Sequence, residues 1–207
     1  MTNRLKYFFD TEFSERAGER PTIDLISIGI VCEDGREYYA ESSEFLDRLC
    51  NPWVKENVLP LLGPEEERKS KETIRDEVLA FIQAPGGHRL RIYPEFWAYF
   101  ADYDWVVFCW LFGAMADLPQ HFPKYCRDLQ QEADRLGLKA SQRPPKPNKE
   151  HNALADARWN MELWEVLEQK DALITNTAQI LERLYLDSSP SAKKLRKELM
   201  KWNVGNE

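Results

Sequence analysis

The sequence predicts an α/β domain in which a mixed β-sheet is flanked by α-helices. Two patterns support this prediction. Three strand-like segments follow one another within the first 41 residues, and the rest of the chain alternates strand-like and helical patterns. With 207 residues, 43% of them apolar and seven of them Trp, the chain is long enough to bury a sizeable core.

Short apolar runs and turn residues predict the elements of the N-terminal part. Strands are expected where apolar, aromatic or β-branched residues cluster, and a loop where Gly and Pro interrupt a polar stretch. Asp34-Gly35 is a hairpin signal. The expected elements are strands at residues 6–9, 24–32 and 37–41, a loop at 11–22, and an irregular or briefly helical segment at 51–62.

Helical spacing becomes clear in the middle of the chain. Residues 71–83 carry apolar side chains every three or four positions, with Ser70 as the expected N-cap. The other expected elements are strands at 89–93 and 95–99 around Pro94, a buried helix at 105–112 ended by Gly113, and a helix at 125–136 ended by Gly137.

The C-terminal part is predicted to be helical. Residues 139–150 are basic and rich in proline, and none of them is expected to anchor this stretch in a core. Helices are then expected at residues 152–170, 173–186 and 191–202, the last two separated by Pro190. We therefore divide the chain into a domain of residues 1–172 and a helical extension of residues 173–207 that packs on the same domain.

Composition limits the classes of function. The net charge of −7 argues against bulk electrostatic attraction to nucleic acid or to an anionic membrane. It does not exclude a nuclease, because bound divalent cations reverse the local field where carboxylates hold them. Neither a signal segment nor an apolar run long enough to span a membrane is visible, so we expect a soluble, cytoplasmic protein. The four scattered cysteines are expected to be reduced core thiols.

Carboxylates mark three segments that are far apart in the sequence. In residues 9–12 (Phe-Asp-Thr-Glu), the two acids are two positions apart, so in a strand both leave the same face. Acidic cages hold hard divalent cations, and a movable base beside them is typical of phosphodiester hydrolysis. The candidates are Asp10, Glu12, Asp102 or Asp104, Asp156 and His151.

Each segment alone also has an ordinary explanation. The acids of residues 9–12 could form a polar strand end, although ionised groups beside a buried strand are costly unless paired or metal-bound. Either Asp102 or Asp104 could cap a helix. His151 and Asp156 would lie about 140° apart around one helix, unless His151 precedes it. The alanines that flank Asp156 would let this helix pack closely on the sheet.

Three motifs resemble those of the DEDDh family of 3′-5′ exonucleases. They are Phe9-Asp10-Thr11-Glu12, Tyr103-Asp104 before a buried helix, and His151-x-Ala153-x-x-Asp156. More narrowly, residues 53–60, 103–107 and 151–158 resemble the polyadenylate-specific 3′-exoribonuclease AS group. The resemblance covers residues 5–170. It departs from the broader family before Asp104, where Ala101-Asp102-Tyr103 replaces the common Asn-x-x-Phe.

This resemblance implies an RNase H-like fold and a metal-dependent 3′-5′ exoribonuclease that releases nucleoside 5′-monophosphates. It implies two Mg²⁺ or Mn²⁺ ions bridged by Asp10, with Glu12 and Asp156 at one ion and Asp104 at the other. His151 would take the proton from the attacking water. A preference for adenylate is left open. The alternatives are a DNA 3′-5′ exonuclease of the proofreading type and a non-catalytic nucleic-acid-binding module on the same fold.

Substrate contacts are predicted from aromatic and basic side chains. Phe13 and Trp53 lie near the motifs and could stack on the bases at a single-stranded RNA 3′ end, or they could be core residues. Three basic residues of the proline-rich loop, Arg143, Lys146 and Lys149, could contact phosphates or merely be solvated. The basic helix at 191–202 could pack in a homodimer, contact RNA or cover the core.

Overall fold

The computed structural model describes residues 4–16, 22–83, 92–147 and 150–204. These residues fall into two compact units, Met1–Glu165 and Val166–Glu207. The boundary lies inside the long helix α5 (Ala153–Leu186), so the first turns of this helix belong to the first unit. Each unit is therefore described by itself.

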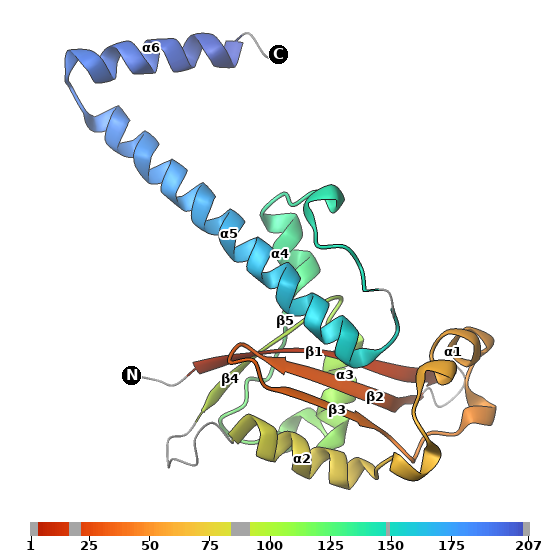
Figure 1. Cartoon of the computed structure of the whole chain (residues 1–207). Coiled ribbons are helices and arrows are strands. Elements are labelled where there is room, and N and C mark those ends of the chain that lie inside the picture. The colour runs from red at the N-terminus through yellow and green to blue at the C-terminus, as the bar shows by residue number, and fades with distance from the viewer. Residues whose placement is uncertain (1–3, 17–21, 84–91, 148–149, 205–207) are drawn as a thin grey trace. The chain divides into compact units, whose positions relative to one another are not determined.

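The first unit is built on a mixed sheet with the strand order β3-β2-β1-β4-β5 (Figure 1). The strands are β1 (Arg4–Arg16), β2 (Thr22–Cys32), β3 (Glu37–Glu41), β4 (Tyr93–Ala98) and β5 (Arg127–Asp128). The first three pair antiparallel as consecutive hairpins, whereas β4 and β5 join parallel to β1. This arrangement confirms the predicted mixed α/β sheet.

Helices cover both faces of this sheet. The helices of the first unit are α1 (Pro52–Asn57), α2 (Lys71–Gln83), α3 (Asp102–Leu111), α4 (Leu129–Arg135) and the start of α5. The second unit consists of the rest of α5 and of α6 (Pro190–Val204). Short 3₁₀ turns lie at Asp47–Leu49, Leu59–Leu61, Glu65–Glu67, Met115–Asp117 and Ala140–Gln142. Figure 1 shows α2 and the first turns of α5 on opposite faces.

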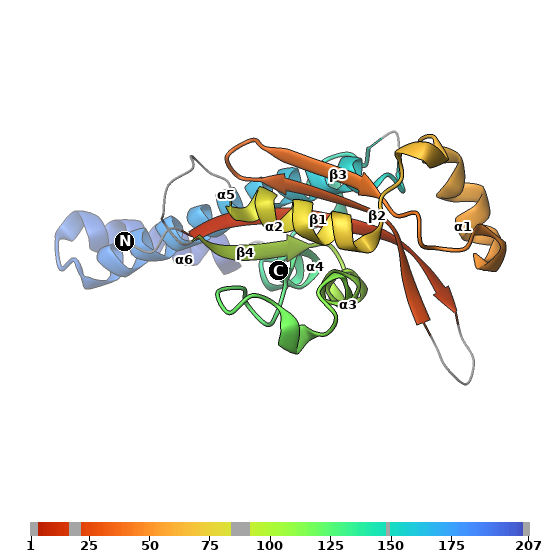
Figure 2. The same cartoon turned by 90° about the horizontal axis from the view of Figure 1, so that it is seen from below.

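The main hydrophobic core lies between the sheet and the helices α2 and α3. Figure 2 shows α2 along its length and α3 nearly end-on, so the axes of the two helices cross. Aromatic residues of β1 and β4 pack there against aliphatic residues of both helices. The central members are Tyr7, Phe9, Ile28, Ile30, Ile74, Val78, Ile82, Phe96, Val107 and Phe108. Their alternation along the strands is the period of two expected of a sheet with one face on this core.

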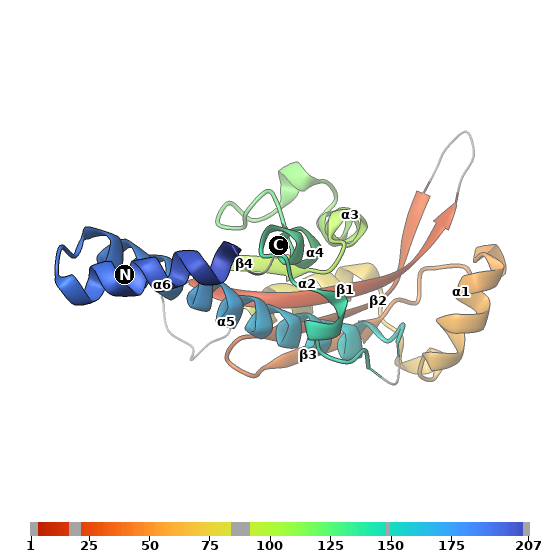
Figure 3. The same cartoon turned by 90° about the horizontal axis from the view of Figure 1, so that it is seen from above.

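The opposite face of the sheet receives the start of α5 (Figure 3). The ring of Phe8 lies 5.3 Å from that of Trp164, and Ala153 and Ala157 are fully buried. Asn160, also buried, donates a hydrogen bond of 2.9 Å from Nδ2 to the carbonyl oxygen of Phe9. The small side chains therefore do what the sequence predicted, since they let α5 pack closely on β1 and β2.

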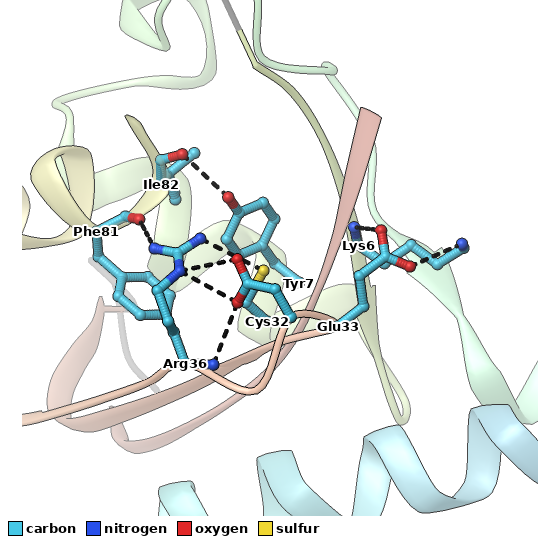
Figure 4. A network of polar contacts seen from close by, with 8 residues as sticks. Lys6, Tyr7, Cys32, Glu33, Arg36, Phe81 and Ile82 are labelled. Carbon is cyan, nitrogen blue, oxygen red and sulfur yellow. Dashed lines mark hydrogen bonds and ion pairs between the residues drawn. The ribbon is translucent and has the colours of Figure 1, made fainter. Parts of the chain in front are cut away.

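A polar network ties one end of α2 to the β2–β3 hairpin (Figure 4). Tyr7 donates from its hydroxyl to the carbonyl oxygen of Ile82 at 3.0 Å. Arg36 donates to the carbonyl oxygen of Phe81 and forms an ion pair with Asp34 at 2.9 Å. The last carbonyl groups of a helix have no partner within the helix, so these side chains satisfy them.

Several predicted elements are confirmed by the structure. The hairpin turn at Gly35 has a φ of 88°, which suits glycine, and β3 has the predicted bounds. Helix α2 covers the predicted residues, and the hydroxyl of Ser70 accepts the N–H of Thr73 as an N-cap. The four cysteines are free thiols, and three of them are buried.

The predicted loop at residues 11–22 is wrong in its described part, because β1 continues to Arg16 and β2 begins at Thr22. Pairing between the two strands extends through this polar stretch, where Arg16 and Asp24 form an ion pair at 3.1 Å. A register shift between Glu12 and Phe13 interrupts the ladder. These residues form strand because they pair with a partner strand, and the local sequence does not reveal that partner.

Other helix and strand boundaries also differ from the predictions. The helix predicted at 105–112 begins earlier, at Asp102, and the one predicted at 125–136 begins only at Leu129, because Arg127–Asp128 pair with β4 as β5. The strand predicted at 95–99 begins at Tyr93 and includes Pro94. Most of the strand predicted at 89–93 lies outside the described residues.

The two helices predicted at 152–170 and 173–186 are one helix, α5, because the residues between them include neither Gly nor Pro. In the second unit, Arg196 of α6 donates to the carbonyl oxygens of Leu184 and Tyr185, each at 2.7 Å, and so caps the end of α5. The division at residues 172 and 173 and the packing of the extension stay predictions. Within the described ranges, no helix combines the length and hydrophobicity needed to span a bilayer.

Candidate active site

Alternation along β1 places its two acids on the face that α5 covers. Tyr7 and Phe9 point into the core beneath the sheet, whereas Phe8 faces α5. Because neighbouring side chains of a strand point to opposite faces, Asp10 and Glu12 share the face of Phe8. The sequence prediction that both carboxylates leave one face of a strand is confirmed, although they lie within β1 and not at its end.

A glycine lets α5 approach these acids. Gly29 of β2 pairs with Asp10 of β1, and a Cβ atom at this position would overlap the backbone of Ala153 and Leu154. Only a residue without a side chain can therefore lie beneath the start of α5. This close approach brings Asp156, in the first turn of the helix, to the acids of β1.

Three carboxylates from two elements form one cluster. One oxygen atom from each of Asp10, Glu12 and Asp156 lies within 4.8 Å of the other two. Glu12 is buried, and the other two are half-buried. Oxygen ligands at such distances are the donor set that Mg²⁺ and Mn²⁺ prefer.

A fourth carboxylate comes from the first turn of α3. Asp104 is only 6% exposed, and its Oδ1 accepts hydrogen bonds from both the backbone N–H, at 2.9 Å, and the hydroxyl of Thr11. Asp102, two residues earlier, is exposed. The structure thus brings Asp104 to β1 beside the other acids and leaves Asp102 at the surface.

These residues line a pocket of about 390 Å³. Of the residues predicted from the sequence, the pocket includes the four acids, His151 and Phe13, but not Trp53. The complete lining is Asp10, Thr11, Glu12, Phe13, Tyr99, Phe100, Tyr103, Asp104, Lys146, Glu150, His151 and Asp156. Three segments that are distant in the sequence therefore meet in one cavity.

The acids in this pocket resist ionisation. Burial, followed by repulsion from Asp156 and Asp104, raises the pKa of Glu12 to about 8. Burial, followed by the charges of Asp104, Glu12 and Asp156, raises the pKa of Asp10 well above its usual range. The charge of Lys146 lowers the pKa of Asp10 only in part, and the carboxylates still repel one another. The pocket therefore fits a divalent cation, which would stabilise their ionised forms.

Hydrogen bonds limit the rise in pKa at the other two acids, Asp104 and Asp156. Burial raises the pKa of Asp104 to about 6, against the hydrogen bonds from Thr11, which lower it. Burial also raises the pKa of Asp156, whereas the backbone N–H of His151 and the charge of Lys146 lower it. These two acids are therefore held in place by polar contacts that favour their ionised forms.

His151 precedes α5, as predicted, and lines the same pocket. Its backbone has a φ of 68°, which is rare for a residue other than glycine, and its N–H donates to Oδ2 of Asp156 at 2.9 Å. Its ring meets the ring of Trp53 edge to face, with 4.6 Å between centroids. Trp53 is 51% exposed, so it is a surface residue that supports His151 and is not a core residue.

Phe13 combines with an aromatic residue of α3. Its ring stacks on that of Tyr103, with centroids 5.8 Å apart and an angle of 11° between the planes. Both line the pocket, and Tyr103 is exposed. The pocket therefore has a flat aromatic wall beside the acids, which is the kind of surface on which an unpaired base stacks.

The proline-rich segment is anchored, contrary to the sequence prediction. Lys146 lies with its ammonium group 3.6 Å from the centroid of Trp159, and Arg143 donates to the hydroxyl of Tyr99 at 2.7 Å. The indole N–H of Trp159 donates to the carbonyl oxygen of Pro144 at 3.1 Å. These contacts with aromatic residues elsewhere in the chain hold Lys146 in the pocket.

Some lining residues gave no sequence signal of a role. Tyr99 and Phe100 follow β4 directly, a common place for site residues, but only their position in space associates them with the acids. Glu150 adjoins His151 and lay at the end of the predicted loop. Gly29 is visible as a glycine within a strand pattern, which is a known sign of a close backbone approach.

The sequence of this chain is similar to those of known proteins. The family model of the 3′-5′ exoribonuclease Rv2179c-like domain matches residues 5–168. The 3′-5′ exoribonuclease Rv2179c of Mycobacterium tuberculosis strain H37Rv is 38% identical over 169 residues, which cover 81% of this chain and 95% of that relative. The 3′-5′ exoribonuclease MT2234.1 of strain CDC 1551 matches to the same extent.

Solved structures confirm the RNase H-like fold. Apo exonuclease I superposes with a TM-score of 0.55 and 14% identity over 84% of this chain and 45% of that one. Exonuclease I of E. coli in complex with a 5cy-dA13 oligonucleotide has a TM-score of 0.54 and 15% identity, over 84% of this chain and 43% of that one. The chain spans less than half the length of these structures, and at this identity the likeness concerns the fold alone.

The family match covers all the acids and His151 of the pocket. Residues 169–207 lie outside it. The predicted enzyme class, a 3′-5′ exonuclease that hydrolyses phosphodiester bonds, is confirmed by this match. The chain belongs to the Rv2179c-like 3′-5′ exoribonuclease domain family.

Proposed function

We propose that this protein is a metal-dependent 3′-5′ exoribonuclease of the DEDDh type, which releases nucleoside 5′-monophosphates from single-stranded RNA. The observation that carries this proposal is the cluster of Asp10, Glu12 and Asp156, with oxygen atoms within 4.8 Å of one another in a pocket that also contains Asp104 and His151. The 38% identity to an exoribonuclease supports RNA as the substrate.

The four acids are the proposed ligands of two Mg²⁺ or Mn²⁺ ions. Asp10 would contact both ions, Glu12 and Asp156 one of them, and Asp104 the other. When bound, the cations would activate a water molecule and stabilise the departing 3′-oxygen. The raised pKa values of Asp10 and Glu12 support this assignment, because a cation bound beside these acids would favour their ionised forms.

His151 is the proposed general base. Imidazole changes its charge near neutral pH and can accept the proton of an attacking water. The hydrogen bond from its N–H to Asp156 couples its backbone to a proposed metal ligand, and Trp53 supports one edge of its ring. The hydrogen bond fixes the backbone of His151, and the ring contact comes from Trp53, which does not line the pocket.

Aromatic and basic side chains in the pocket or beside it are the proposed substrate contacts. Phe13, stacked on Tyr103, is placed to bind an unpaired base, and Trp53 is exposed beside His151. Lys146 would contact a phosphate group, since it lines the pocket and its charge lowers the pKa of both Asp10 and Asp156. We also propose a preference for adenylate, which rests on the motif resemblance alone.

The test is to incubate the purified protein with RNA and DNA oligonucleotides labelled at either end, with Mg²⁺, with Mn²⁺ or with EDTA. We expect release of nucleoside 5′-monophosphates from the 3′ end of RNA with either metal, and no release with EDTA. Faster hydrolysis of poly(A) than of the other homopolymers would support the adenylate preference.

The same assay can contradict each part of the proposal. Faster hydrolysis of DNA than of RNA would assign the enzyme to deoxyribose substrates. Undiminished activity in EDTA would exclude the metal mechanism. Absence of hydrolysis under all conditions, while the protein still binds RNA, would indicate a non-catalytic binding module.

A further inference from the structure

Phe100 is the most exposed of the aromatic residues that line the acid pocket. Its side chain is 63% exposed, compared with 48% for Tyr103, whereas Phe13 and Tyr99 are partly buried. A phenylalanine in this position forgoes the stabilisation that burial of its ring would contribute. Packing of the core therefore does not explain why a large apolar side chain lies here.

The backbone of Phe100 is also strained. Its φ is 56°, which is a genuine outlier for a bulky residue. Among the described residues other than glycine, only Phe100 and His151 have a positive φ, and both line the same pocket. Backbone strain of this kind persists where the surrounding structure maintains it, and it clusters at functional sites.

Hydrogen bonds of the next residue, Ala101, maintain the positive φ of Phe100. The N–H of Ala101 donates to Oδ2 of Asp128 at 2.7 Å, and the carbonyl oxygen of Ala101 accepts the N–H of Trp105 at 2.8 Å. These bonds connect the turn after β4 to the start of α4 and to α3. Phe100 is thus held in this conformation by its neighbours.

Tyr99 supports the ring of Phe100 from one side. The two ring centroids lie 4.4 Å apart. The hydroxyl of Tyr99 donates to Gln130 at 2.9 Å and accepts from Arg143 at 2.7 Å, so this support is fixed at its polar end. The result is an aromatic ring with a rigid backing and a free surface at the pocket.

We propose that Phe100 binds the nucleobase of the nucleotide that enters the pocket, by stacking against its face. This inference rests on the proposed function, since it concerns the same pocket. A base in a duplex is already stacked and paired, so such a contact favours single-stranded 3′ ends. Stacking uses the face that all bases share, so this contact tolerates every base.

The substitution Phe100→Asn removes the aromatic ring but should preserve the backbone conformation, because asparagine adopts positive φ more readily than phenylalanine. The affinities for adenosine 5′-monophosphate and for ribose 5-phosphate, which lacks the base, are measured by calorimetry with Mg²⁺ present. We expect wild type to bind the nucleotide more tightly than the sugar phosphate. The variant should bind the nucleotide about 5- to 150-fold more weakly, with unchanged affinity for ribose 5-phosphate and an undiminished Tm.

Tyr125→Asn is the matched control, since Tyr125 is an aromatic residue, 60% exposed, that does not line the pocket. It should leave both affinities unchanged. The proposal is overturned if Phe100→Asn binds the nucleotide as wild type does, if wild type does not distinguish the two ligands, or if the variant loses both affinities together with a lower Tm. These outcomes need no hydrolysis, so they are distinct from failure of the exonuclease assay.

Discussion

Acidic side chains at the two ends of the β1–β2 pair have pKa values shifted in opposite directions. Near the start of β1, in the network of Figure 4, burial opposes ionisation of Asp34, but hydrogen bonds from Arg36 and Cys32 overcome it and lower its pKa. Further along the same strand, burial and neighbouring acids raise the pKa of Asp10 and of Glu12. The first end has its charges paired within the protein, whereas the second gathers like charges.

This difference indicates that the network around Arg36 stabilises the fold, whereas the acid cluster serves function. The charges of Arg36 and Asp34 are half-exposed and neutralise each other, and Arg36 also donates a hydrogen bond to the carbonyl oxygen of Phe81. Among the described residues, no ion pair neutralises Asp10 or Glu12, and both acids line a pocket, which fits a site for a cationic ligand. Substitutions at the two ends should therefore have opposite effects on stability and on activity.

Asp10→Asn should have the largest effect on activity. It removes the proposed ligand shared by both metal ions, and we expect exonuclease activity to fall by about 10³-fold or more. The Tm of the metal-free protein should not fall, because the substitution relieves repulsion among the acids. Activity assays and thermal denaturation in EDTA measure the two quantities. A variant that keeps its activity would show that the cluster is not catalytic.

His151→Ala should have the next largest effect. Loss of a general base typically costs about 10²- to 10⁴-fold in turnover. Metal affinity should change little, since His151 contacts Asp156 through its backbone N–H, which alanine retains. Calorimetric titration with Mn²⁺ and the pH dependence of kcat are the measurements. If turnover is unchanged, or if metal affinity is lost together with activity, the assignment of His151 as the base is wrong.

Arg36→Met should lower stability and leave activity unchanged, which is the reverse of the effect expected for Asp10→Asn. It leaves Asp34 and the carbonyl oxygen of Phe81 without their donor, so the free energy of unfolding should fall by about 0.5–1.5 kcal/mol. The value of kcat should stay at the wild-type level, because the network does not line the pocket. Urea denaturation and activity assays check this.

Arg75→Met is the matched control for this experiment. Arg75 also pairs with carboxylates, Glu72 and Asp76, but on the exposed surface of α2. Ion pairs of this kind contribute little to stability, so its unfolding curve should match that of wild type. Equal losses in the two variants would show that the network has no special role.

The last prediction concerns the pH dependence of stability. In the metal-free protein, Glu12 keeps its proton up to a pKa of about 8, whereas in the unfolded chain it ionises near the usual value of 4.5. The native state therefore binds more protons between these values, and the free energy of unfolding should fall as the pH rises, by about 1.4 kcal/mol per pH unit for each proton.

Glu12→Gln should flatten this decline, because the amide does not titrate. Urea denaturation in EDTA at intervals between pH 5 and pH 8 would show the difference in slope. Addition of Mg²⁺ at pH 8 should stabilise wild type more than the variant, since bound cations favour the ionised carboxylates. Parallel curves for the two proteins would contradict the raised pKa of Glu12.

Much of the candidate site could be predicted from local sequence. A strand with acids two positions apart predicts that both share a face, and β1 confirms this. Ser70 and the spacing of apolar residues predicted α2 for a similar reason, since capping and amphipathicity depend on near neighbours. Helical spacing does not distinguish Asp102 from Asp104, because both lie in one helical turn, so the sequence favoured Asp104 only through the motif that surrounds it.

The sequence by itself determined the order of the acidic motifs, the period of each main element and the close packing of α5 through its alanines. These properties depend on residues within a few positions of one another. Only the tertiary structure decided that Asp104 and not Asp102 reaches Thr11, that Gly29 admits α5 to the sheet, and that Lys146 and Phe100 join the pocket. The physical reason is that these contacts join residues distant in the chain, and pairing and packing in three dimensions bring them together.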